Sequence, residues 1–278
     1  MAKHIERKIN QLERLLPEGL LVDAYWMEVH GYSRSLRKQY VDHGWLEQPV
    51  RGVYRRQRGQ LGWEQVVISL QALLHQPVSI GGRTALELQG YAHYLSKDPQ
   101  AICLYADSKL PGWLHKLPGC PQFVVYNRMR FLPKIEVPAS WGLDSNSEPP
   151  ESPQLPASLR VLPWGQWHWP LVVSAPERAI LELLDDVPGT VSFELADKFM
   201  ESLVDLRPQR MQQLLMVATS VKVKRLFLFF ADRHRLQWLS RIDRNKIELG
   251  SGKRVIAKGG KLDKTYHITV PEEMYGIR

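Results

Sequence analysis

Apolar residues recur every three or four positions along the first part of the chain, a spacing typical of amphipathic helices. The first such stripe predicts a helix that ends at Pro17, and its members are Ile5, Ile9, Leu12 and Leu16. A second short helix is expected over 20–29. Gly31 then permits a tight turn into a third helix that begins at Ser33, because serine is a favoured N-cap residue.

The segment 32–56 carries the third helix and a hairpin, in the sequence YSRSLRKQYVDHGWLEQPVRGVYRR. Gly44 is suited to end the helix, because glycine tolerates the left-handed backbone found there. Two short strands, 45–46 and 53–54, flank a turn at 49–52. Three helices closed by a basic hairpin are typical of a winged helix-turn-helix, whose third helix enters the major groove of DNA.

The pattern changes after this unit. The polar run QRGQLG at 57–62 predicts a domain boundary, so we expect a winged helix-turn-helix domain over 1–58 and a larger domain over 59–278. Helix-like and strand-like segments both occur in the larger domain, which makes it mixed α/β and the fold class α+β. Residues 144–158, with four prolines and few apolar side chains, are expected to form a mobile loop.

In the larger domain, strands are expected early and late, with helices between them. Helices are predicted over 61–74, 84–88, 174–184, 192–204, 208–218 and 222–234. Strands are predicted at 101–105, 123–126, 161–162, 171–173, 253–257 and 266–270. Ser174 and Glu177 have the spacing of a capping box. Lys258–Lys261, KGGK, is expected to turn between the last two strands.

Composition narrows the class of protein. The 278 residues suffice for two domains with buried cores. Only Cys103 and Cys120 are present and no CxxC occurs, so neither a disulfide framework nor a zinc site is expected. No apolar run approaches the roughly 18 residues that span a bilayer, and the N-terminus lacks the apolar core of a signal peptide. We therefore expect a cytoplasmic protein without a membrane partner.

The charge is uneven along the chain. The net charge of +8 comes from 37 Lys/Arg and 29 Asp/Glu. Residues 1–58 hold 11 basic and 7 acidic side chains, and residues 221–278 hold 14 and 6, whereas the segment between them is net acidic. Two basic ends fit contact with a polyanion, although a solubilising basic tail would have the same composition.

In the first domain, the third helix is expected to expose a cationic face, and the hairpin adds further arginines. Arginine most often pairs with guanine in the major groove, and lysine and arginine also bind phosphates. We therefore predict that Arg34→Ala or Arg37→Ala weakens DNA binding. The expected DNA-contacting residues are Ser33, Arg34, Arg37, Lys38, Arg51, Tyr54, Arg55 and Arg56.

A second basic surface is expected near the C-terminus. It starts on the helix over 222–234, whose Leu226, Phe229 and Phe230 are expected to be buried, and continues to the end of the chain. This surface suits nucleic acid, an acidic protein or a nucleotide-handling partner, and the residues do not distinguish between them. Its expected members are Lys222, Arg225, Arg233, Lys246, Lys253, Arg254, Lys258 and Lys261.

Signatures of catalysis are missing from the sequence. GSGKR at 250–254 resembles a phosphate-binding loop, but Ile247 replaces the first glycine and Arg254 the final Ser/Thr. No HExxH, GxSxG or GxGxxG occurs. The carboxylate pair Asp185 and Asp186 is expected to be solvent-exposed at a helix end. The turn WGQWHW at 164–169 is expected to pack on a sheet rather than to stack bases. No enzyme activity, cofactor or metal is therefore expected.

Several segments together resemble the AbiEi-type antitoxins of bacterial abortive-infection, type IV toxin–antitoxin systems. They are GWLEQPVRGVYRR, GWEQVVISLQALL with GGRTALELQGY, SAPERAILELLDDVP, and DRNKIELGSGKRVIAKGGKLDKTYHITVP. The resemblance covers nearly the whole chain, apart from the proline-rich loop over 144–158.

This resemblance implies a transcriptional autorepressor whose winged domain binds inverted repeats in its own promoter. It implies that the larger domain counters a cognate nucleotidyltransferase-like toxin without the need for a stable complex. It also implies a functional role for basic residues of the C-terminal domain.

Two other functions remain open on the residues alone. One is a nucleic-acid-processing enzyme that the winged helix directs to its substrate, which cleavage of DNA or RNA with Mg²⁺ or Mn²⁺ would reveal. The other is a plain regulator whose larger domain senses a ligand or mediates dimerisation, which a neighbouring gene for a nucleotidyltransferase would argue against.

Overall fold

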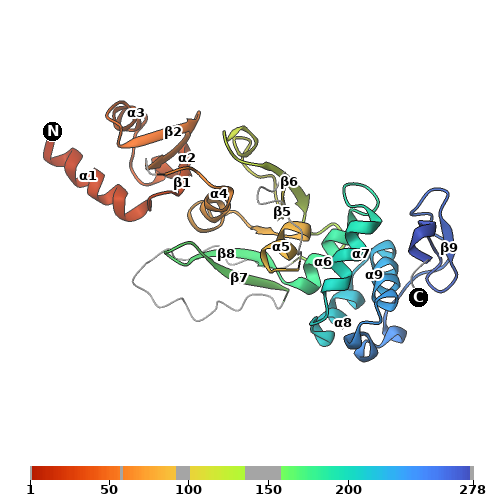
Figure 1. The fold of residues 1–278 in the computed structure, drawn as a ribbon. Helices are drawn as coiled ribbons and strands as arrows, with labels where there is room; N and C mark the ends of the chain where they lie inside the picture. Colours follow the sequence, from red (N-terminus) through yellow and green to blue (C-terminus); the bar gives the residue numbers. More distant parts are fainter. Residues whose placement is uncertain (1, 57–58, 92–100, 135–157, 276–278) are drawn as a thin grey trace.

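The structure is a computed structural model that describes residues 2–56, 59–91, 101–134 and 158–275. Its elements follow one another along the length of the molecule, with the N-terminal helices at one end and the C-terminal hairpin at the other (Figure 1). The proline-rich segment lies outside the described residues up to position 157. Within the described ranges, no helix has the length and apolar character needed to cross a membrane.

The N-terminal unit is a winged helix-turn-helix, as the sequence predicts. Its three strands form one antiparallel sheet in the order β1-β3-β2. The core between helices and sheet includes Leu16, Leu21 and Met27, all fully buried. In chain order its elements are α1 Ala2–Leu15, β1 Leu21–Asp23, α2 Ala24–Val29, α3 Arg34–Asp42, β2 Leu46–Val50 and β3 Val53–Arg56.

The helix expected over 20–29 is wrong in its first half. Leu21–Asp23 is a strand, because its residues pair with β3 in a register that sets Val22 against Tyr54. Asp23 then starts α2 as its N-cap, and its Oδ1 accepts the amide of Trp26 at 2.8 Å. A residue-level pattern could not show this strand, since its partner lies more than thirty positions later in the chain.

The third helix and the hairpin form as predicted. Ser33 is the N-cap of α3, with its Oγ accepting the amide of Leu36 at 3.3 Å. Gly44 has the left-handed φ of 73° expected after the helix. The hairpin turn is tighter than predicted: it consists of Arg51 and Gly52, and Pro49 belongs to β2.

The larger unit is built on a five-stranded mixed sheet in the order β6-β5-β4-β8-β7. Strands β5 and β6 are parallel, as are β4 and β8, and the remaining pairs are antiparallel. The first part of this unit consists of α4 Trp63–Ile68, the π-helical turn η1 Ser69–Leu73, β4 Val78–Ile80, α5 Gly82–Leu88, β5 Ala101–Ala106, the 3-10 turn η2 Leu114–Lys116, β6 Gln122–Asn127, β7 Leu159–Trp164 and β8 Trp169–Ser174.

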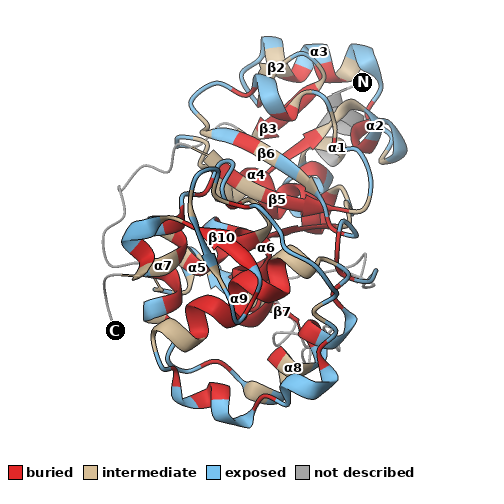
Figure 2. Ribbon diagram, turned by 90° about the vertical axis from the view of Figure 1, so that its right-hand side faces the viewer, coloured by how far each residue is buried: buried red, intermediate tan, exposed pale blue. Residues whose placement is uncertain are grey.

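The second part is helical and ends in a two-stranded hairpin. In chain order it consists of α6 Pro176–Asp185, α7 Phe193–Ser202, α8 Pro208–Val217, α9 Val221–Arg233, the 3-10 turns η3 Gln237–Arg241 and η4 Arg244–Lys246, β9 Lys261–Asp263, β10 Ile268–Val270 and η5 Glu272–Tyr275. Helices α6 and α9 are the most buried and pack together at the centre of this part (Figure 2).

The turn η1 connects the two units and closes the central sheet. Gln71 lies between β4 and β8: its Nε2 donates to the carbonyls of Val78 and Val172 at 3.1 Å each, and its Oε1 accepts the amide of Val172. Ser69 faces the other way and accepts the amide of Leu21 in β1 at 2.9 Å. The π-helical turn thus directs Ser69 to the winged unit and Gln71 to the sheet of the larger unit.

Two expectations about the larger unit are corrected. Ser174 ends β8 and does not cap α6, because the N-cap is Ala175; the buried Glu177 instead accepts the amide of Arg207 at 2.9 Å. The segment 253–257 forms only one bridge, at Arg254, rather than a strand. The terminal hairpin consists of β9 and β10, so KGGK leads into β9, which begins at Lys261, instead of forming the turn.

Candidate nucleic-acid interface

Helix α3 presents a polar and cationic face to solvent. Arg34 and Lys38 lie one turn apart on this face and are exposed, as is Ser33 at its N-terminal end. Neither cation forms an ion pair with any residue that the structure describes. Ser35 and Gln39 are exposed beside them. The sequence prediction did not include these two, although they follow Arg34 and Lys38 directly and share their spacing of four.

Arg37 does not lie on this face, which corrects the prediction. Its side chain is only 4% exposed, and the guanidinium binds α2: Nη1 donates to the Ala24 carbonyl at 2.7 Å and Nη2 to Glu28 Oε1 at 2.8 Å. Its Cζ also lies 5.6 Å from the ring centre of Tyr54. Arg37 therefore fixes α3 against α2 and β3 and cannot reach a base edge.

The wing offers one exposed arginine. Arg51 lies at the tip of the β2–β3 hairpin, exposed and without an ion-pair partner in the described ranges. Gly52 beside it has a φ of 81°, and its carbonyl accepts the amide of Ala24 at 2.8 Å, which anchors the tip to α2. Tyr54 is buried beneath Arg37, contrary to the prediction that it contacts DNA.

Arg55 and Arg56 also bind other parts of the protein, contrary to the prediction that they contact DNA. Arg55 is buried and donates to Glu47 at 2.7 Å and to the Gly59 carbonyl at 2.8 Å. The guanidinium of Arg56 lies at the C-terminal end of α1, where it donates to two carbonyls and pairs with Glu13 and Glu18. A cation is favourable at that end of a helix. Both arginines attach the wing to its surroundings.

Tyrosines seal the core beneath α3. The hydroxyl of Tyr32 donates to the Lys8 carbonyl at 3.0 Å, and the Tyr32 and Tyr40 rings lie 6.3 Å apart. Burial, and secondly the neighbouring Tyr40, raise the pKa of Tyr32 to about 12. The neutral phenol is therefore part of the folded domain at ordinary pH.

This pKa predicts an alkaline loss of stability. The pKa of Tyr32 is higher in the folded protein than the value near 10 of an unfolded chain. Its contribution to stability is therefore fully present below pH 10 and is lost as the pH rises towards 12. Tyr32→Phe should therefore lower the melting temperature at pH 8, through loss of the hydrogen bond to Lys8, and this difference should shrink between pH 10 and 12. Tyr25→Phe is the control, since that ring is 75% exposed. An unchanging difference for Tyr32→Phe would contradict the prediction.

Three members of the predicted C-terminal surface are structural. Arg225 is 2% exposed and donates to four loop carbonyls. Lys222 caps the end of α6 through the carbonyls of Asp185 and Val187, and burial lowers its pKa despite Asp185 nearby. Arg233 pairs with Asp197 at 3.0 Å. Their placement on a basic surface is wrong, because each guanidinium or ammonium group binds the protein.

The remaining predicted cations of this surface are exposed. Lys246 pairs with Asp243 at 3.4 Å, and Lys261 lies 4.7 Å from the ring centre of Tyr275. Lys253, Arg254 and Lys258 form no ion pair with the residues that the structure describes. The structure thus brings the last three together on the segment that precedes β9.

The carboxylate pair is not a solvated helix end. The Asp185 carboxylate is 11% exposed and pairs with Arg130 at 2.9 Å and Lys222 at 3.9 Å. Burial raises its pKa, although both cations oppose the change. Burial raises the pKa of the nearby Tyr126 phenol, and Asp186 raises it further. In the described part of the chain, no three His, Cys, Asp or Glu side chains gather as they would around a metal ion.

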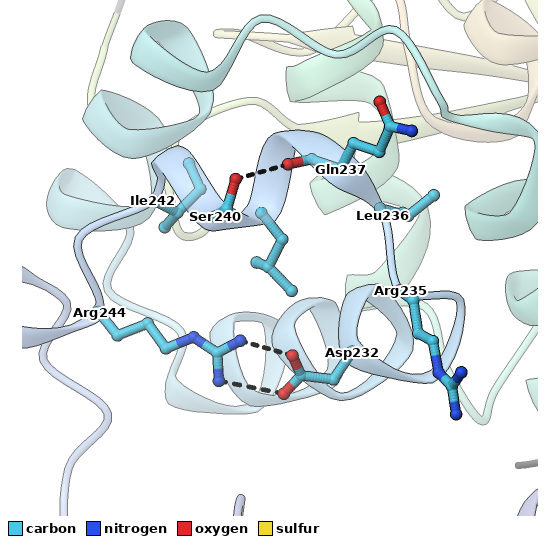
Figure 3. Close-up of a pocket in the computed structure, with 8 residues that line it drawn as sticks. Asp232, Arg235, Leu236, Gln237, Ser240, Ile242 and Arg244 are labelled. Carbon is cyan, nitrogen blue, oxygen red and sulfur yellow. Dashed lines mark hydrogen bonds and ion pairs between the residues drawn. The ribbon is translucent and has the colours of Figure 1, made fainter.

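An open depression of about 660 Å³ lies between α9 and η3 (Figure 3). Asp232 and Arg244 face each other across it, with Nη1 3.1 Å from Oδ2, and Arg235 points away (Figure 3). The hydroxyl of Tyr266 also donates to Asp232. Asp232 and Arg244 of this depression are therefore already paired, and Leu236, Leu239 and Ile242 give it an apolar lining beside them.

The tryptophan-rich turn braces the two units. Trp164 and Trp169 stack with ring centres 6.1 Å apart, and Trp169 is buried beside Gly19, which follows α1. Trp167, by contrast, is 63% exposed. Together with the hydrogen bond that the Leu21 amide donates to Ser69, this contact holds the winged unit against the larger one.

Comparisons with known proteins agree with this architecture. The chain is similar in structure to the RV2827C protein from Mycobacterium tuberculosis, with a TM-score of 0.54 and 15% identity over 95% of this chain and 89% of that one. At this identity the likeness shows the fold alone. No curated protein matches the sequence.

Two family models cover nearly the whole sequence. Residues 5–97 match the one described as "Transcriptional regulator, AbiEi antitoxin N-terminal domain". Residues 99–271 match the one described as "Transcriptional regulator, AbiEi antitoxin, Type IV TA system". The first match extends beyond the winged sheet, which ends at Arg56. The chain therefore belongs to the AbiEi family of transcriptional regulators and antitoxins of type IV toxin–antitoxin systems.

Proposed function

We propose that this protein represses its own operon by binding double-stranded promoter DNA, and that it counters a cognate nucleotidyltransferase-like toxin without catalysis. The exposed face of α3 carries the proposal: Arg34, Ser35, Lys38 and Gln39 line one side of a capped helix, and the wing adds Arg51. An α-helix fits the major groove, where such side chains bond to base edges and phosphates.

The buried arginines support this reading of the surface. Arg37 fixes α3 to α2 and to the Tyr54 ring of β3, and Arg56 fixes the wing to α1, so the exposed cations stand on a rigid base. A binding face held by packed side chains loses little conformational entropy on association. We propose residues 1–58 as the DNA-binding domain and 59–278 as the antitoxin domain.

Fluorescence anisotropy with the chain's own promoter tests the DNA-reading part. The promoter should bind at least tenfold more tightly than a scrambled duplex at about 150 mM salt. Equal affinity for both duplexes would refute sequence recognition. Inverted repeats in the protected promoter segment would fit one protein copy on each half-site.

Arg51→Ala should weaken binding to promoter and scrambled DNA by the same factor, because the wing tip is suited to a phosphate contact. The slope of log affinity against log salt should become shallower by about one for each protein copy bound. Gln39→Ala is the contrasting variant: it should weaken promoter binding selectively, because glutamine is suited to pair with adenine. If Arg51→Ala and Gln39→Ala lowered the ratio of promoter affinity to scrambled-DNA affinity equally, these roles would be contradicted.

The antitoxin part rests on family membership and has its own test. Co-expression with the product of the neighbouring toxin gene should restore growth. Growth that stays arrested would remove the antitoxin proposal and leave the repressor proposal intact. The absence of catalysis is tested with DNA or RNA and Mg²⁺ or Mn²⁺, where cleavage by the pure protein would contradict it.

A further inference from the structure

Tyr25 in α2 is a large aromatic side chain that the fold leaves in solvent. The residue is 75% exposed, and its hydroxyl has no hydrogen-bond partner among the residues that the structure describes. Every other tyrosine in the described ranges is buried or half-buried. Packing within the chain therefore does not explain tyrosine at this position. A tyrosine is well suited to an interface, because its ring packs while its hydroxyl forms a hydrogen bond.

The start of α2 lies between the wing tip and α3. The amide of Ala24, the residue before Tyr25, donates to the carbonyl of Gly52 at the wing tip at 2.8 Å. The carbonyl of Ala24 accepts Nη1 of Arg37, which extends from α3, at 2.7 Å. A Cβ added to Gly52 would lie 4.0 Å from the Cβ of Ala24, so the wing tip approaches α2 closely. One residue of α2 therefore contacts both elements that carry the exposed cations.

Tyr25 lies on the side of α2 that is turned towards α3. Residues three positions apart share a face of a helix, so Tyr25 shares a face with Glu28. The Glu28 carboxylate binds Arg37 of α3 at 2.8 Å, which fixes the direction of this face. The exposed Arg34 is one turn before Arg37 on α3, and the exposed Arg51 adjoins Gly52. Tyr25 is therefore placed between the cations of α3 and the cation of the wing.

The DNA backbone has to cross this position if both cationic elements bind one duplex. In helix-turn-helix proteins the helix before the recognition helix crosses the backbone, while the recognition helix lies in the major groove. Tyrosine is among the side chains that donate hydrogen bonds to phosphate oxygens. The acidic Glu28 nearby is already paired with Arg37, so its charge is offset. The chemistry around Tyr25 thus suits a phosphate.

We propose that Tyr25 contacts the DNA backbone, and that its hydroxyl donates a hydrogen bond to a phosphate between the groove bound by α3 and the wing tip. The inference rests on the proposed DNA binding and adds a positioning residue to it. A phosphate contact fixes the orientation of the protein on the duplex and carries no sequence information. Tyr25 would thereby take the role that the sequence prediction gave to the buried Tyr54.

Tyr25→Phe tests the contact, because it removes the hydroxyl and keeps the ring. Fluorescence anisotropy with the full-length protein should show an affinity about tenfold lower, the loss expected for one hydrogen bond to a charged group. The loss should be equal for the promoter and a scrambled duplex. The slope of log affinity against log salt should not change, because a neutral phenol displaces no counterion. Arg51→Ala, by contrast, is expected to make that slope shallower.

Val29→Ala is the control on the same helix. Val29 is 64% exposed and lies one turn after Tyr25, further from the wing tip, so its truncation should leave the affinity unchanged. Equal losses in Tyr25→Phe and Val29→Ala would overturn the proposal, since they would reflect a general disturbance of α2. A loss of promoter preference in Tyr25→Phe would overturn the backbone contact as well, because it would indicate contact with a base.

The outcomes distinguish this contact from the proposed function. A parent protein that binds promoter and scrambled DNA equally would refute sequence recognition, whereas a weaker Tyr25→Phe on both duplexes would still support the phosphate contact. Promoter selection by the parent protein together with unchanged affinities of Tyr25→Phe would refute the Tyr25 contact alone.

Discussion

Arg178→Ala should lower the free energy of unfolding by about 3–5 kcal/mol. Arg178 and Glu182 form an ion pair at 2.7 Å inside α6, with side chains 1% and 0% exposed. The second oxygen of Glu182 accepts the amide of Gly82 at 2.9 Å, which ties α6 to the start of α5. Without the arginine, a buried carboxylate would lose its countercharge, and the cost of desolvating it would no longer be offset.

Arg83→Ala is the matched control for that change. Arg83 also pairs with a glutamate four residues later, Glu87, but its side chain is 46% exposed. Its removal should cost less than the removal of Arg178, because solvent screens the exposed guanidinium, although Glu87 itself is only 12% exposed. Urea denaturation followed by circular dichroism compares the two variants. If the urea midpoints of the two variants were similar, burial would not determine how much the Arg178–Glu182 pair contributes to the free energy of unfolding.

Arg37→Ala should destabilise the winged domain by about 2–3 kcal/mol and lose promoter binding as a consequence. The change removes a charge-assisted bond to Glu28, a bond to the Ala24 carbonyl and the contact with the Tyr54 ring. Thermal denaturation should show an early transition for this domain. Lowering the temperature well below that transition should restore most of the DNA affinity.

Arg34→Ala should have the opposite profile. Its side chain is exposed and unpaired in the described ranges, so the melting temperature should remain that of the parent protein. Promoter affinity should fall at least tenfold at every temperature, the expected loss for an arginine that contacts a base edge.

If Arg37→Ala weakened DNA binding with no loss of stability, the buried role of Arg37 would be refuted.

Local signals in the sequence predicted the elements of the winged unit well. Ser33 and Gly44 mark the ends of α3, and Gly52 marks the hairpin tip, because caps and tight turns depend on residues close in the chain. The helices over 192–204, 208–218 and 222–234 were likewise predicted to within a few residues. The strand β1 was missed because it exists only through its pairing with β3.

Whether each arginine is exposed or buried could not be predicted from the sequence. Arg34 and Arg37 lie three positions apart on one helix, yet one faces solvent and the other binds Glu28. Likewise, Arg225 was assigned to a surface, whereas its partners are carbonyls at least 24 positions away. A guanidinium is buried only where acceptors from several elements converge, and a single sequence does not show that convergence.

The π turn η1 also has a consequence for how the protein is made. Gln71 joins β4 to a strand 101 positions further along the chain, and contacts of such separation close late in folding. Trp169 of β8 must also arrive before it can pack beside Gly19. The winged domain therefore leaves the ribosome first but acquires its full support only after β8 has been synthesised. A nascent chain truncated before β8 would carry the winged unit without the contact between Trp169 and Gly19, so the attachment of this unit depends on completion of the larger one.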